Sequence, residues 1–124
     1  MVTRTDYLRS MLEQALDSHN TIQQLQDKPG DLVTLRQELL RAKGILQVIV
    51  GRVDPRDHPS VDIGGLASRA ALFLDSYYFE REMDIMEPLY GDDPGRLRHM
   101  RLTILAALED RGLIAKMKEV LAEL

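Results

Sequence analysis

Residues 31–51 read DLVTLRQELLRAKGILQVIVG. Apolar side chains recur in this stretch at alternating spacings of three and four residues: Leu32, Leu35, Leu39, Ala42, Leu46 and Ile49. This spacing puts the whole set on one side of an α-helix. Such a stripe needs a second helix to cover it, because the burial of apolar surface supplies much of the free energy of folding. The stretch therefore predicts a helix packed inside an all-α domain.

Two turns of similar chemistry divide the chain. Pro29 and Gly30 form the first turn, and Pro94 and Gly95 form the second. Pro and Gly are typical of the places where helices end and begin. Before, between and after the turns, apolar residues recur at helical spacing, which predicts helices over 5–26, 31–50, 61–86 and 97–108 and a shorter one over 113–124. We expect one domain, residues 1–124, that forms an antiparallel four-helix bundle of two αα-hairpins, with room for a short fifth helix at the C-terminus.

Local signals predict the ends of these helices. Asp31 is the expected N-cap of the second helix, and Gly51 is the expected residue after its last turn. Ser60 or Asp62 is expected to cap the third helix. Gly44 lies inside the second helix, where glycine costs about 1 kcal/mol relative to alanine. We therefore interpret Gly44 as a place where a neighbouring helix crosses closely.

The predicted third helix carries two apolar stripes instead of one. The first consists of Leu66, Ala70, Phe73 and Tyr77, and the second of Leu72, Phe79, Met83 and Met86. Because the two stripes overlap along the chain, residues 70–79 of this predicted helix are apolar on most sides. A helix of that composition is buried from more than one direction. We expect it to take a central position or to be covered in part by a second copy of the chain, and we expect the aromatic residues 77–79 to pack in the core.

Composition excludes several classes of protein. Cysteine is absent, which rules out disulfides and thiolate-bound metals. The formal net charge of −4 gives a surface that on the whole repels phosphate backbones. No apolar run is long enough for a signal peptide or a membrane span, so we expect a soluble cytoplasmic protein.

Three carboxylates fall on one face of the predicted third helix: Glu80, Asp84 and Glu87. Like charges at these spacings repel one another, so a cation is expected to face them. A metal ion is one alternative, although the Glu-x-x-His pairs of carboxylate-metal bundles are missing. We expect ion pairs across the second hairpin instead, with Glu87 near Arg98 and Asp84 near Arg101.

A basic segment, RLRHMR over residues 96–101, opens the predicted fourth helix. Arginines at a helix N-terminus can bind phosphate, which makes a nucleic-acid-binding regulator an alternative function. Asp92 and Asp93 lie beside the segment, however, and no aromatic residues alternate with its arginines. Of the three histidines, His58 is the best candidate for a ligand contact or a response to pH, because it lies in the long connection 52–60.

No nucleophile or carboxylate partner for a catalytic histidine is identifiable by spacing, and no cofactor motif or metal-ligand spacing is recognisable. We therefore expect a non-enzymatic adaptor or regulatory subunit that binds no cofactor and acts through protein–protein contacts, as a homodimer or on another protein. Methionines adapt well to partner surfaces, and charged residues surround those near the second turn. The expected contact residues are Tyr78, Phe79, Met83, Met86, Arg96, Arg98 and Arg101.

Overall fold

The computed structural model describes residues 2–75 and 78–124, and within them the chain is all-α. Its helices are α1 (Arg4–Gln24), α2 (Asp31–Arg52), α3 (Ile63–Asp75), α4 (Phe79–Tyr90), α5 (Pro94–Glu109) and α6 (Leu113–Glu123). A single 3-10 turn, Pro55–Asp57, lies in the connection between α2 and α3. The predicted short helix at the C-terminus is confirmed as α6, which follows Gly112 in the left-handed conformation at φ +72°.

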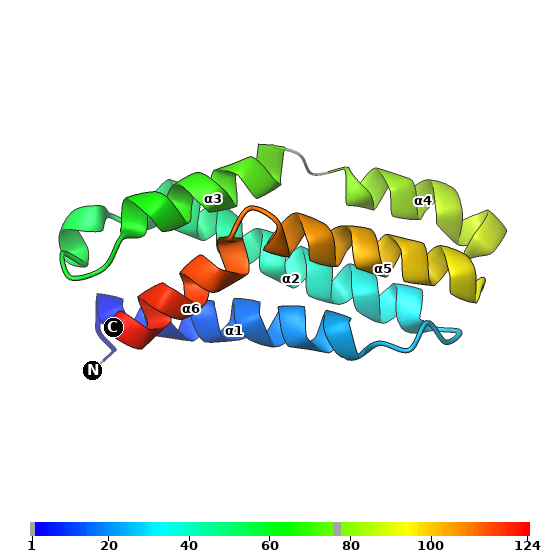
Figure 1. The fold of residues 1–124 in the computed structure, drawn as a ribbon, viewed down its shortest axis with the longest axis horizontal. Helices are drawn as coiled ribbons and strands as arrows, with labels where there is room; N and C mark the ends of the chain where they lie inside the picture. The colour runs from blue at the N-terminus through cyan, green and yellow to red at the C-terminus, as the bar shows by residue number, and fades with distance from the viewer. Residues whose placement is uncertain (1, 76–77) are drawn as a thin grey trace.

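The helices lie roughly along one long axis (Figure 1). α1 and α2 form the first hairpin, and α3 and α4 follow one another along one edge of the molecule. α5 returns beside α4, and α6 then turns back toward α1. α2 packs against α1, α3, α4 and α5, so it is the central helix. The two chain termini lie at the same end of the molecule, away from α4.

The core confirms the stripe of α2. Its six apolar residues, Leu32, Leu35, Leu39, Ala42, Leu46 and Ile49, are each at most 4% exposed. Every helix contributes buried apolar side chains to the core that surrounds this stripe. The helix over 31–49 thus lies where the alternation of three and four residues predicts, covered by other helices on its apolar side.

The prediction of one helix over 61–86 is wrong, because α3 ends at Asp75 and α4 begins at Phe79. The two apolar stripes therefore belong to two helices. The ring centroids of Phe73 and Phe79, on either side of the break, lie 6.3 Å apart. Leu72 and Tyr78 are exposed, so residues 70–79 are not covered on all sides. Tyr77 lies outside the described residues.

Two carboxylates shape the helix starts. Asp62 is confirmed as the cap of α3, since its side chain accepts a backbone hydrogen bond from the first turn at 2.9 Å. The prediction that Asp31 is the N-cap of α2 is wrong. Gly30, at φ +93°, takes the cap position, and Asp31 is the first helical residue. The Asp31 carboxylate instead accepts hydrogen bonds from the backbone N–H groups of Gln26 and Lys28, and these bonds hold the preceding turn.

Other predicted details are corrected. A Cβ atom built on Gly44 meets no atom within 4 Å, so no helix crosses closely there. α2 continues through Gly51 to Arg52, so Gly51 does not end it. α4 runs past Pro88 to Tyr90, although the proline has no backbone N–H to donate, and the helical bonding continues after it with the Gly91 N–H donating to the Glu87 carbonyl at 3.2 Å.

Candidate functional site

The inner face of α4 is part of the core. Phe79, Met83 and Met86 recur at helical spacing and are 6%, 0% and 9% exposed. The sequence predicts all three as partner contacts, but the structure places their side chains inside the chain. Packing accounts for them, since methionine and phenylalanine fill irregular core spaces well. Of the four predicted contacts within 78–86, only Tyr78 is exposed.

The acidic face of α4 turns toward α2. Arg36 of α2 donates through Nη1 to Asp84 Oδ1 at 2.7 Å and through Nη2 to Glu87 Oε2 at 2.9 Å. Lys43, two turns along α2, pairs with Glu80 at 3.1 Å. The hydrogen bond to Asp84 is the main reason that the pKa of Arg36 is raised. The cations that face these carboxylates therefore come from α2, and they anchor α4 to the central helix.

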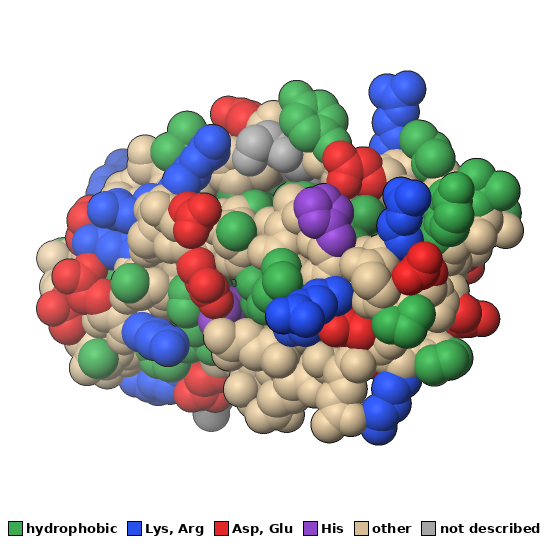
Figure 2. Space-filling view, turned by 45° about the vertical axis from the view of Figure 1, so that its right-hand side comes forward, with side chains coloured by type: hydrophobic (Ala, Val, Ile, Leu, Met, Phe, Trp, Pro, Cys, Tyr) green, Lys and Arg blue, Asp and Glu red, His purple; other side chains and the backbone are tan. Residues whose placement is uncertain are grey.

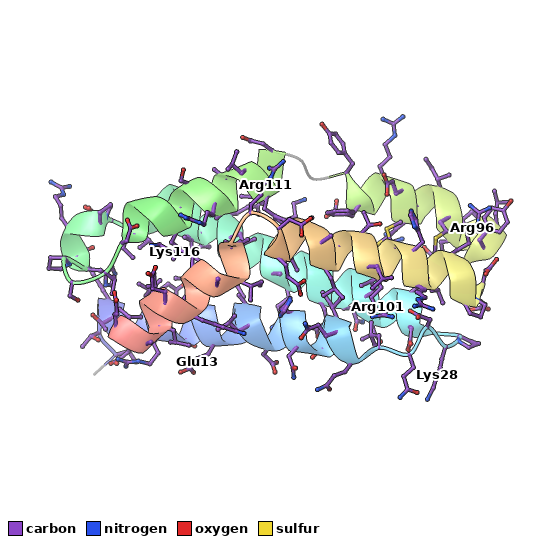
Figure 3. All side chains as sticks on the ribbon, viewed as in Figure 1. Glu13, Lys28, Arg96, Arg101, Arg111 and Lys116 are labelled. Atoms are coloured by element: carbon purple, nitrogen blue, oxygen red, sulfur yellow. The ribbon has the colours of Figure 1, made fainter. Side chains whose placement is uncertain are left out.

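The predicted pairs between α4 and α5 are therefore wrong. Arg101 pairs instead with Asp27 in the turn between α1 and α2, with Nε–Oδ1 and Nη2–Oδ2 distances of 2.9 and 3.1 Å. Figure 3 shows Arg101 reaching from α5 toward that turn. This hydrogen bond raises the pKa of Arg101, and both side chains are largely buried. Arg101 thus serves the fold of the chain itself.

The other two arginines of the basic segment differ in their surroundings. The guanidinium of Arg96 lies 4.2 Å from the centroid of the Tyr90 ring, a cation–π contact between α5 and α4. Asp93 caps α5 by accepting hydrogen bonds from the N–H groups of Gly95 and Arg96 at 2.9 and 3.4 Å. This carboxylate fills the place that a phosphate would take at the helix N-terminus. Arg98 is exposed and forms no ion pair with any described residue.

The outer face of α4 is apolar as well. Tyr78, Ile85 and Leu89 are 65%, 63% and 71% exposed. Spacings of seven and four residues put them on one side of the helix, and we call this set the outer stripe. Sequence reasoning missed Ile85 and Leu89. The signal was present, because a helix whose two opposite faces both carry apolar residues has more than one partner surface.

A hollow of about 250 Å³ lies between the outer stripe and α5. Its apolar wall consists of Ile85, Met86, Leu89, Tyr90 and Met100, and its rim is polar. We call it the α4–α5 hollow. Figure 2 shows hydrophobic side chains gathered at this end of the molecule, with charged side chains of both signs among them.

A second hollow, of about 550 Å³, adjoins the first at the end of α4. Leu89 and Tyr90 line both of them, and Val33 of α2, itself 55% exposed, lies in the second. Leu89 therefore stands as an exposed ridge between two hollows. This arrangement of ridge and hollow suits contact with another folded surface.

His19 belongs to the fold. Its Nε2 lies 2.7 Å from Glu109 Oε1 and its ring is buried, so it links α1 to the end of α5. Among the described residues no cluster of three or more acidic or histidine side chains could hold a metal ion. None of the helices that the structure describes is both long and apolar enough to cross a membrane. No protein-family model matches the chain, nor does any curated protein or any solved structure.

Proposed function

We propose that the protein is a non-enzymatic interaction protein that forms a homodimer through the outer stripe of α4 and the α4–α5 hollow. The observation that carries the proposal is Leu89, which is 71% exposed beside an apolar hollow. In this proposal the fold is a variant of the antiparallel four-helix bundle, in which α3 with α4 and α5 with α6 each take the place of one long helix.

Ridge and hollow lie side by side on one surface, which supports a symmetric dimer. In a two-fold dimer the same patch meets itself, so a ridge on one copy must fit a hollow on the other. Ile85 and Leu89 provide the ridge, and the apolar wall around Met86 and Met100 provides the hollow. Full burial of one leucine or isoleucine stabilises a contact by about 1.5–3 kcal/mol.

The charges at the rim favour a second copy over a partner of one charge sign. The rim of the α4–α5 hollow carries one charge of each sign, Glu82 and Arg96, and within the described chain neither forms an ion pair. A surface that carries both signs can satisfy itself when it is turned through a two-fold axis. A strongly acidic or strongly basic partner would leave half of these charges opposed by like charges.

The proposed alternatives have less support. A nucleic-acid site at the start of α5 would retain Arg96 and Arg98, but Arg101 is bound to Asp27 and Asp93 occupies the helix N-terminus. A carboxylate metal site would need free acids, but Asp84 and Glu87 are paired with Arg36.

The mass of the protein in solution, measured by light scattering or sedimentation across micromolar to millimolar concentrations, tests the proposal. We expect a dimer for the natural chain and a monomer for Leu89→Asp, because a carboxylate cannot enter the apolar hollow. Val50→Asp is the matched control, since Val50 is 42% exposed at the far end of α2. It should remain dimeric.

Far-UV circular dichroism checks that both variants are folded, since each should retain the helix content of the natural chain. A natural chain that stays monomeric at every concentration would contradict the proposal, whether or not it captures another protein. A Leu89→Asp variant that remains dimeric would place the interface elsewhere.

A further inference from the structure

A different hollow, of about 460 Å³, lies at the opposite end of the molecule from α4. The start of α1, the end of α2 and the connection that follows α2 surround it. Leu8, Met11 and Val48 form an apolar wall, and Tyr7 stands beside them. The volume is within the range of sites for small organic molecules. We call it the His58 hollow.

His58 is the polar group that marks this hollow. Its side chain lines the space and the residue is only 5% exposed, yet its Nδ1 has no hydrogen-bond partner. The main chain at His58 is fixed, because the His58 N–H donates to the Pro55 carbonyl and the His58 carbonyl accepts from the Val61 N–H. A buried nitrogen without a partner is unfavourable, so His58 gains a hydrogen bond if its ring turns this nitrogen toward a polar group bound in the hollow.

The charges around the hollow leave an unpaired cation. Asp57 pairs with Arg4 at 2.8 Å, and Asp54 pairs with Arg56 at 2.9 Å, so both carboxylates are neutralised. Arg52 also lines the hollow, and it forms no ion pair with any residue that the structure describes. The uncompensated charge at this site is therefore positive.

We propose that the His58 hollow binds a small carboxylic acid with an apolar body. The carboxylate accepts hydrogen bonds from the guanidinium of Arg52 and from the imidazole of His58. The apolar body lies against Leu8, Met11 and Val48. Arginine suits this role, because its planar fork of donors matches the two oxygens of a carboxylate. The site is separate from the α4 surface, so it does not rest on the dimer proposal.

A titration with phenylacetate, followed by the backbone-amide NMR spectrum, tests this inference. Phenylacetamide is the matched probe, since it has nearly the same shape without the charge. We expect phenylacetate to shift signals of Tyr7, Val53 and His58 and to bind about tenfold more tightly than the amide, as a charge-assisted hydrogen bond predicts.

Two arginine variants distinguish direct contact with the carboxylate from a general effect of the positive charge of the protein. Arg52→Gln should weaken phenylacetate binding about tenfold, because it removes the fork of donors. Arg81→Gln is the control, since Arg81 is exposed on α4, does not line the hollow and forms no ion pair with any described residue. Its affinity should equal that of the natural chain.

His58→Gln should also weaken binding, with the fold checked by thermal unfolding. The inference is overturned if millimolar phenylacetate causes no shifts, if the amide binds equally well, or if Arg52→Gln binds as the natural chain does. Shifts confined to the α4–α5 hollow would overturn it too. The mass measurement that tests the dimer is independent of all these outcomes.

Discussion

Asp27 is held in the left-handed conformation at φ +62°, a position that asparagine and glycine also accept readily. Its carboxylate makes a two-point contact with Arg101, and the two side chains are only 13% and 15% exposed. The turn between α1 and α2 is thereby fixed to α5. The conformation and the ion pair are separate contributions to stability, and one substitution can distinguish them.

Asp27→Asn keeps a side chain that tolerates positive φ and removes the charge. We expect it to lower the free energy of unfolding by about 1.5–3 kcal/mol, because the Arg101 guanidinium is left largely buried without its partner. Urea unfolding measures the change. Asp17→Asn is the control, since Asp17 pairs with Arg41 but is 62% exposed, and it should change stability by less than about 1 kcal/mol. Equal changes in the free energy of unfolding at both positions would show that the buried ion pair contributes no more than the exposed one.

The sequence predicts α2 correctly but does not predict that α4 is a separate helix. The stripe from Leu32 to Ile49 predicts α2 well, since each position follows from helical period and burial alone. Helical period and burial do not reveal the break before α4. Two apolar stripes on one long segment are equally compatible with a helix covered on two sides and with two helices of different register. Only the packing of Phe79 and Met83 against the rest of the core distinguishes them.

The candidate site was predictable in part for the same reason. The sequence identifies Tyr78, Arg96 and Arg98 near a surface at the second hairpin, and all three are exposed. It does not reveal that Arg101 reaches the first turn, because that contact joins residues 74 positions apart. Nor does it say which cation faces an acidic stripe, since Arg36 lies on another helix and its position depends on how α4 packs.

The acidic face of α4 leads to a prediction of its own. Arg36→Glu would place a like charge against Asp84 and Glu87. We expect it to lower the free energy of unfolding by about 1–2 kcal/mol, because exposed ion pairs contribute about 0.2–1 kcal/mol each and like charges repel by similar amounts. Hydrogen exchange should show the largest loss of protection in α4, the helix that these pairs anchor.

Lys118→Glu on α6 provides the comparison, since Lys118 is exposed and forms no ion pair within the described residues. It should change stability by no more than about 0.5 kcal/mol. Uniform loss of protection over all helices in Arg36→Glu would mean that α4 does not open separately from the rest.

The molecule as a whole is tied together by carboxylates whose pKa values lie below their usual range. A hydrogen bond from Lys116 of α6, labelled in Figure 3, is the main reason that the pKa of Asp62 is lowered. The same carboxylate caps α3. The pKa of Asp6 is lowered by backbone and side-chain hydrogen bonds from Thr3 at the start of α1. These groups join or begin helices that lie far apart in the sequence.

Such groups make stability depend on pH in one direction. Because the pKa of Asp62 is lower in the folded chain than the unfolded value of 3.8, its contribution is fully present above pH 3.8 and is lost as the pH falls through the folded pKa. Asp62→Asn should therefore be less stable than the natural chain at neutral pH, and the difference should shrink in acid. Urea midpoints measured over that pH range test this. A difference that stays constant would mean that the carboxylate charge has no part in it.

The position of the two chain termini has a practical consequence. The start of α1 and the end of α6 lie together at the end of the molecule opposite α4. An affinity tag or fluorescent protein fused at either terminus would stand clear of Leu89 but close to the entrance beside Tyr7 and His58. Fusions are therefore suitable for measuring the mass of the dimer in solution. Titrations with small acids require protein from which the tag has been removed.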